Sequence, residues 1–170
     1  MRLNLGCGMD YRKDCINVDI SPNVKVDMRF SLDEFPYPLD DESVSYLYCS
    51  HTLEHLKEPE KALNEFKRII RPGGVLHIRT PHSCHISNWG HIQHRRAFSL
   101  HIKYFLTDCF ELMSEKLEYG NGKYSSKYWI RYLIDIPINF LANLHIRLCE
   151  RVWCYWVGGF EGMELIMRKK

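Results

Sequence analysis

Short apolar runs alternate with polar or helical segments through the first half of the chain. Five of these runs are predicted as β-strands, and they cover residues 3–5, 15–20, 24–30, 44–49 and 75–79. Between the last two runs, Pro59 fits the first turn of a helix, and apolar residues from Ala62 to Ile70 recur every three or four positions. Strands that alternate with helices in this way predict an α/β fold with a mostly parallel sheet.

The connection between the first two predicted strands is unusually short. Only seven residues lie between Gly8 and Ile16, whereas a complete strand–helix–strand crossover takes at least about 10–12 residues. We therefore predict that the first crossover helix is reduced to about one turn or replaced by a loop.

The second half of the chain has a less regular pattern. Polar, histidine-rich residues 82–96 predict a long loop, and residues 107–117 predict a helix with Thr107 as its N-cap. Residues 119–122 predict a turn. Apolar residues from Ile130 to Leu148 have helical spacing, which Pro137 is expected to break or kink. Gly158 and Gly159 predict another break, and residues 163–167 a last strand, expected to be antiparallel.

Composition places the chain among ordinary globular proteins. Its 170 residues are 45% apolar and 26% charged, which fits one domain and excludes a disordered or low-complexity chain. The net charge of +2 is too small to indicate nucleic-acid binding. Seven scattered cysteines, with no C-x-x-C pair and no recognisable signal peptide or spanning segment, predict a reducing, cytoplasmic setting.

The first predicted strand ends in a glycine turn, Gly6-Cys7-Gly8. Because glycine has no β-carbon, such a turn lets a ligand approach the backbone closely. Asp19 follows the second run, where a carboxylate can accept two ribose hydroxyls, and Asp27 lies in the third run, near enough to meet a base. The same residues also fit a tight turn with aspartates that cap or solvate loops, so the turn alone does not decide the function.

The order of the motifs adds to this evidence. LNLGCG, INVDI, VDMRF, DDESVSYLYCSHTLEHL and ALNEFKRIIRPGGVLHIRTP follow one another between residues 3 and 82. This series resembles class I S-adenosylmethionine-dependent methyltransferases. The resemblance implies a three-layer Rossmann-like fold over residues 1–170, with residues 1–82 as the cofactor-binding half and residues 83–170 as the substrate-side and covering half.

The resemblance also implies roles for individual residues. The glycine turn would border the methionine part of S-adenosyl-L-methionine, Asp19 would hold the ribose, and Asp27 with the Met28 backbone would lie at the adenine. The implied cofactor-binding residues are Leu5, Gly6, Cys7, Gly8, Asp19, Ile20, Asp27, Met28, Ser50 and His51. The chain departs from the family pattern at Asp10, which replaces the third glycine, and in its short first crossover.

Three alternatives remain open. A dinucleotide-binding dehydrogenase would need a glycine where Tyr11 stands and room for a helix after it. His51, Glu54 and His55 spell H-x-x-E-H, a zinc hydrolase signature, although Pro59 limits any helix there to a short one. A cofactor-binding protein without turnover is the third alternative, suggested by the short crossover.

The histidine-rich segment is the predicted substrate side. His82, His91, His94 and Arg95 are the candidate substrate-binding residues. A histidine can act as a general base near neutral pH, but methyl transfer does not require one, so no catalytic residue is assigned. The histidine spacings match no standard metal site, so no metal is predicted. A polar surface loop fits this segment as well, and the acceptor is expected to be a small molecule.

Residues 128–157 hold three of the four tryptophans. The simplest interpretation is a helix that covers the sheet in place of the short first crossover. A homodimer face and a membrane-surface contact are the other two interpretations, since large apolar patches usually find a partner. No nucleic-acid partner is predicted.

Overall fold

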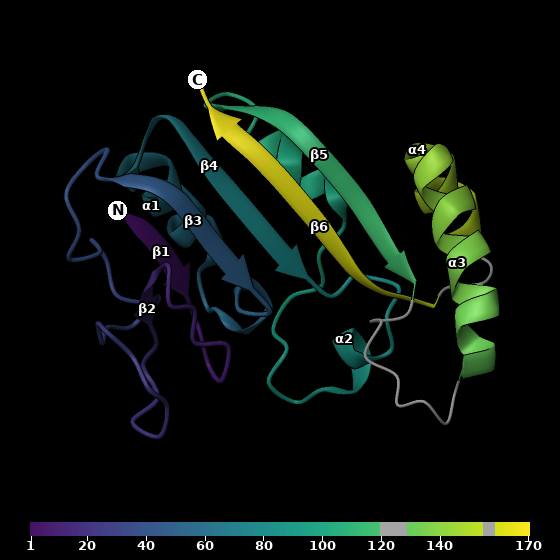
Figure 1. Cartoon of the computed structure of the whole chain (residues 1–170), viewed down its shortest axis with the longest axis horizontal. Helices are drawn as coiled ribbons and strands as arrows, with labels where there is room; N and C mark the ends of the chain where they lie inside the picture. The colour runs from purple at the N-terminus through teal and green to yellow at the C-terminus, as the bar shows by residue number, and fades with distance from the viewer. Residues whose placement is uncertain (120–128, 155–158) are drawn as a thin grey trace.

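The computed structural model describes residues 1–119, 129–154 and 159–170. In these residues one six-stranded sheet has the order β2-β1-β3-β4-β6-β5 (Figure 1). Its strands are β1 (Arg2–Leu5), β2 (Ile16–Val18), β3 (Val44–Ser50), β4 (Ile70–Thr80), β5 (Phe110–Tyr119) and β6 (Phe160–Lys169). The helices and helical turns are η1 (Leu53–His55), α1 (Pro59–Ile69), α2 (Ser87–Gly90), η2 (Leu100–Phe105), α3 (Trp129–Leu144), α4 (Ile146–Leu148) and the π-helical η4 (Cys149–Trp153).

The directions of the strands bring the carboxyl ends of several strands together at one edge of the sheet. β1 pairs in parallel with β2 and β3, and β3 pairs in parallel with β4. In this register Leu5 lies opposite Val18 on one side and Cys49 on the other, so the carboxyl ends of β1, β2 and β3 meet. β6 runs antiparallel to β4 and to β5, as expected for the last strand. The predicted α/β, three-layer Rossmann-like fold with a mostly parallel sheet is confirmed.

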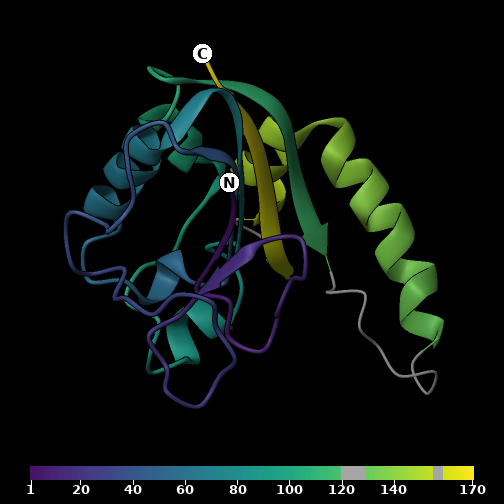
Figure 2. The ribbon, with the colours of Figure 1, turned by 60° about the vertical axis from the view of Figure 1, so that its left-hand side comes forward.

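One face of the sheet carries the main core. The apolar side of α1, formed by Ala62, Leu63, Phe66 and Ile69, packs against buried strand residues such as Leu3, Leu47 and Leu76. Figure 2 shows α1 on this side of the sheet. Its predicted position is confirmed, and Pro59 occupies its first turn. The chain passes directly from α1 into β4 at Ile70, so this strand begins earlier than the pattern suggested.

The opposite face near β1 and β3 is polar. Residues 6–15 form no helix, which confirms the short first crossover. Instead, the Arg12 guanidinium stacks 3.6 Å from the centre of the buried Tyr48 ring. The Asn4 side chain donates to the Asp10 carbonyl and to Asn17 Oδ1. The Arg12 side chain and the Asp10 carbonyl, both from the loop after β1, therefore lie over part of this face beside β1 and β3.

Two predicted elements are wrong. Residues 24–30 form no strand, and only a single parallel bridge joins Val18 to Met28. Residues 107–117 do not form a helix, and most of them belong to β5 instead. β5 pairs with β6 from Phe110 opposite Lys169 to Tyr119 opposite Phe160. This long pairing satisfies the backbone and overrides the helical spacing of the apolar residues.

The apolar segment lies elsewhere than predicted. α3 runs along β5, at the end of the sheet opposite β1 and β2, so it does not replace the missing crossover helix (Figure 1). Pro137 lies inside α3 without ending it, and the first interruption comes at His145. The turn predicted at residues 119–122 and the break at Gly158 lie mainly outside the described residues.

Asparagines of α3 hold the outer edge of β5. Asn143 accepts a hydrogen bond from the Leu117 amide and donates to the Leu117 carbonyl, at 2.9 Å each. Asn139 makes the same pair of bonds with Tyr119, at 2.8 and 2.7 Å. These side chains occupy edge-strand groups that would otherwise be open to another strand.

The other side of this helical segment is apolar and exposed. Its exposed residues include Ile136, Phe140, Leu141, Leu144, Leu148 and Val152. The homodimer and membrane-surface interpretations stay predictions for this surface. None of the helices within the described ranges is long and apolar enough to cross a membrane.

Candidate cofactor-binding site

The turn after β1 uses its two glycines differently. Both have left-handed backbone conformations, with φ of 65° at Gly6 and 48° at Gly8. A β-carbon on Gly6 would lie 2.2 Å from Thr52 Oγ1, whereas one on Gly8 would meet nothing within 4 Å. Gly6 is therefore required for packing against Thr52, and Gly8 leaves open space in front of the backbone.

Asp19 braces this turn from the end of β2. Its Oδ2 accepts a hydrogen bond from the Gly8 amide, and its Oδ1 accepts one from the Ser21 amide, both at 2.8 Å. An ionised carboxylate has about four acceptor positions. Asp19 therefore keeps acceptor capacity for ligand hydroxyls while it fixes the position of Gly8.

Asp27 and Met28 are largely occupied within the protein. Asp27 Oδ2 accepts from the Asn17 amide and side chain, and Oδ1 accepts from the Tyr11 hydroxyl. The hydrogen bond from the Asn17 amide is the main cause that lowers the pKa of Asp27. The Met28 amide donates to the Asn17 carbonyl. These contacts hold the segment beside β2 in the place where the expected strand is missing.

A cavity of about 910 Å³ begins at the glycine turn. It extends past the ends of β3 and β4, and its lining includes Gly6, Cys7, Gly8, Ser50, His51 and His94. Leu5 is buried in the core beneath it, and Ile20 is exposed at the β2 end. The described geometry thus gathers the glycine turn, Ser50, His51 and one candidate substrate residue around one space.

Sequence reasoning missed much of the cavity floor. Asn4, Arg12, Tyr48, Arg79, Glu118 and His85 also line it. Arg79 Nη2 forms a 2.7 Å ion pair with Glu118. Asn4, Tyr48 and Arg79 alternate with core residues along their strands. This alternation of polar and apolar positions is the sequence signal that could have identified them. They line the cavity because no helix of the described residues covers this face of the sheet.

A cluster of Glu54, His55 and His94 lies at the cavity wall, and His94 lines the cavity. Glu54 is completely buried, its Oε2 accepts from Thr80 Oγ1 at 3.1 Å, and its Oε1 has no hydrogen-bond partner. His94 Nδ1 is also buried without a partner, and ligand atoms of Glu54, His55 and His94 lie within 4.8 Å of one another. Burial lowers the pKa of His94, although the Glu54 carboxylate acts in the opposite direction.

The other candidate substrate residues do not reach the cavity. His82 is 2% exposed, and its Nε2 contacts Glu150 Oε1 at 3.1 Å. His91 is exposed and contacts the His94 ring. Arg95 is exposed, and its amide donates to the Glu54 carbonyl. His82 is thus buried against η4 and is not among the residues that line the cavity, and its role in substrate binding stays a prediction.

The H-x-x-E-H segment does not form the helix that its zinc signature requires. His51 has φ of 50° at the end of β3, and η1 is only a three-residue 3-10 turn. His51 Nδ1 lies 3.5 Å from Glu54 Oε1. The hydrolase hypothesis assumes that both histidines lie on one helix. In this structure they do not.

Residues 3–78 match the family model described as a methyltransferase domain. The chain therefore has the class I, Rossmann-like fold of methyltransferases, and residues 3–78 are similar to a methyltransferase domain. The solved structures support this assignment of the fold. A S-adenosylmethionine-dependent methyltransferase from Archaeoglobus fulgidus is 18% identical, with a TM-score of 0.62, and the match covers 99% of this chain and 85% of the other.

Two further comparisons are informative. A chain of the complex between the Haloferax volcanii Trm112 methyltransferase activator and a methyltransferase is 16% identical, with a TM-score of 0.63, over 98% of this chain and 80% of that one. The probable methyltransferase ltbC of Aspergillus luteorubrus is 28% identical over 45% of this chain and 38% of its own length. The chain thus matches less than two fifths of this curated relative.

The residues present fit the cofactor that this family implies. Gly8 offers an open backbone cradle beside a cavity whose volume lies within the usual range for small-molecule sites, about 300–1,000 Å³. Asp19 has acceptor positions left next to that cradle. Both features suit S-adenosylmethionine, which carries ribose hydroxyls and a flexible amino-acid arm.

Proposed function

We propose that the chain transfers a methyl group from S-adenosylmethionine to a small polar acceptor bound in the 910 Å³ cavity. The observation that carries the proposal is the open space at Gly8, which is braced by Asp19 and continuous with this cavity. When bound, the cofactor supplies a methyl group on a positively charged sulfur. The chain's own residues then have to position the acceptor in line with that methyl group and exclude water.

In this proposal the glycine turn and Asp19 hold the cofactor, and Ser50 and His51 border it at the end of β3. The Gly8 amide is already committed to Asp19, which keeps the turn in one conformation before the ligand arrives. Asp27 acts indirectly, because its bonds to Asn17 and Tyr11 hold the neighbouring segment in place.

His94 is the proposed base on the acceptor side. It lines the cavity, and burial lowers its pKa, so its ring is neutral at pH 7 and can accept a proton from the acceptor. The buried Glu54 carboxylate next to it can stabilise the resulting imidazolium. We therefore expect the transfer rate to fall as the pH drops through the lowered pKa of His94.

The test is calorimetric titration of the whole chain with S-adenosylmethionine and with S-adenosylhomocysteine. A charge-assisted hydrogen bond contributes roughly 1.5–3 kcal/mol. We therefore expect Asp19→Ala to weaken both ligands by at least about tenfold, which corresponds to 1.4 kcal/mol. Failure of the folded wild-type chain to bind either ligand would disprove the proposal.

Asp33→Ala is the matched control. The Asp33 carboxylate also accepts two loop amides, those of Lys57 and Glu58, whereas Asp19 bonds the Gly8 amide of the glycine turn; neither carboxylate is among the residues that line the cavity. Equal loss of affinity in both variants would mean that loop stability, rather than contact with the cofactor, explains the effect. Binding without transfer of a labelled methyl group across a panel of small polar acceptors would favour the alternative of a cofactor-binding protein without turnover.

A further inference from the structure

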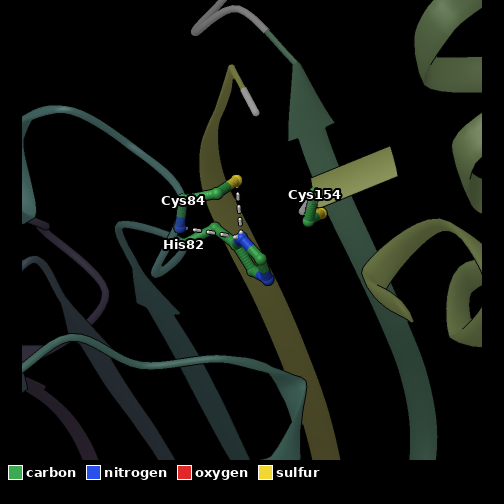
Figure 3. Close-up of side chains that lie close together, drawn as sticks. All are labelled: His82, Cys84 and Cys154. Atoms are coloured by element: carbon green, nitrogen blue, oxygen red, sulfur yellow. Dashed lines mark hydrogen bonds between the residues drawn. The ribbon is translucent and has the colours of Figure 1, made fainter. Parts of the chain in front are cut away.

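Two segments far apart in the sequence meet beyond the end of β4. The first segment is residues 82–84, in which His82 Nδ1 lies 3.0 Å from Cys84 Sγ. The second is the helical segment 149–154, which ends in Cys154. One ligand atom from each of these three residues lies within 4.8 Å of the other two. Figure 3 shows the His82 ring and the Cys84 sulfur directed toward each other, with Cys154 beside them.

The donor set is the kind that zinc selects. Imidazole nitrogen and thiolate sulfur hold Zn²⁺ tetrahedrally, at about 2.0–2.1 Å and about 2.3 Å respectively. Such a site separates neighbouring donors by roughly 3.5–3.8 Å. The observed donors already lie within 4.8 Å of one another, so closing around an ion requires shifts of roughly 1 Å.

The surroundings of His82 support the same chemistry. Its second nitrogen, Nε2, contacts Glu150 Oε1 at 3.1 Å, and the same oxygen accepts a hydrogen bond from the Leu100 amide. Metal-binding histidines usually donate their other ring N–H to a carboxylate, which fixes the tautomer and the ring orientation. With Nε2 held by Glu150, Nδ1 faces Cys84: it contacts Cys84 Sγ at 3.0 Å and accepts a 3.4 Å hydrogen bond from the Cys84 amide, which a bound metal would replace.

Three cysteine sulfurs gather at this place, those of Cys84, Cys149 and Cys154. Cys149 lies within hydrogen-bonding range of Cys154. All three sulfurs pack against the small core cluster formed by Leu100, Leu117, Ala142, Phe160 and Met163.

We propose that His82 Nδ1, Cys84 Sγ and Cys154 Sγ form a structural zinc site, with Cys149 as the nearest thiol for the fourth position. Zinc binding releases the thiol protons to solvent and forms three or four metal–ligand bonds. The ion joins residues 82–84 to the segment that precedes β6. Pro81 and His85, on either side of residues 82–84, line the large cavity, so the ion also holds part of its wall.

The experiment uses the full chain, purified under reducing conditions and stripped of metal with a chelator. Titration with Co²⁺ should give one equivalent bound and an intense sulfur-to-cobalt absorption band, which Zn²⁺ then displaces. Cys84→Ser and Cys154→Ser should each weaken Co²⁺ binding at least a hundredfold. Cys109→Ser, which removes another half-buried thiol outside the site, should leave the affinity unchanged.

Glu150→Gln tests the supporting carboxylate. The expected loss of metal affinity is about 10–100-fold, with the sulfur band retained, because such outer contacts orient the ligand without binding the ion. A metal held by Glu54, His55 and His94 instead would give no sulfur-to-cobalt band. That result would overturn the proposal without affecting the test of cofactor binding.

Alkylation of the wild-type chain covers the case in which a cysteine variant fails to fold. Added Zn²⁺ should protect Cys84 and Cys154 from iodoacetamide but leave the rate at Cys109 unchanged, as mapped by mass spectrometry. Equal alkylation with and without Zn²⁺ would overturn the proposal. So would a Cys84–Cys154 disulfide that persists under reductant, since it would remove two of the three ligands.

Discussion

A substitution at Gly8 can distinguish the loss of a cofactor contact from the effect of backbone strain. Its φ of 48° is a conformation in which a residue with a β-carbon costs roughly 1–2 kcal/mol. For a chain of this size, 1 kcal/mol lowers the melting temperature by roughly 2–4 °C. We therefore expect Gly8→Ala to lower the melting temperature by roughly 2–8 °C.

The effect on ligand binding should be larger than this strain alone explains. The added β-carbon meets no protein atom within 4 Å, so it projects into the open space beside the cavity that Gly8 lines. In the cofactor hypothesis that space is occupied by the ligand. Gly8→Ala should therefore weaken S-adenosylhomocysteine at least about tenfold, or 1.4 kcal/mol, in calorimetric titration of the folded variant.

Gly73→Ala is the control for this prediction. Gly73 has φ of 74°, its β-carbon would also meet nothing within 4 Å, and it lies at the start of β4 outside the cavity. The two variants should lose similar stability, but only Gly8→Ala should lose ligand affinity. If Gly8→Ala binds as tightly as the wild type, the backbone at residue 8 is not a ligand cradle and the reasoning is refuted.

Two further predictions concern the histidine cluster and the sheet edge. Glu54→Gln removes the attraction that partly offsets burial, so the pKa of His94 should fall further below its usual value, as measured by an NMR titration of the ring protons. Asn143→Ala should cost about 1–3 kcal/mol in thermal unfolding and speed hydrogen exchange at the Leu117 amide, because that amide and its carbonyl lose their partner.

Each of these variants has a nearby control. Glu60→Gln changes an exposed carboxylate on α1 and should leave the pKa of His94 unchanged. An unchanged pKa in Glu54→Gln as well would contradict the arrangement of Glu54 behind His94. Leu144→Ala changes an exposed residue next to Asn143 and should not alter exchange at Leu117. Equal exchange in both α3 variants would mean that the helix does not hold the β5 edge.

The local pattern of the sequence determined most of the secondary structure of residues 1–82. In β1, β3 and β4 the residues that face α1 are apolar at alternate positions, and in α1 they recur every three or four residues. Apolar residues at alternate positions share one face only in a strand, and apolar residues every three or four positions share one face only in a helix. The short interval between Gly8 and Ile16 likewise fixed the absence of a full crossover helix, because the chain there is too short to form one.

The tertiary structure decided the elements whose stability comes from distant partners. Residues 110–119 contain strong helix formers such as Glu, Leu, Met and Lys, yet they form β5 because β6 offers a partner along their whole length. Residues 24–30 alternate like a strand, yet β2 has only three residues to pair with, and Asp27 bonds the Asn17 amide with its side chain. The contacts among His82, Cys84 and Cys154 bridge about 70 residues of sequence. Such contacts form only when the whole sheet is assembled, because neither segment carries a local signal for the other.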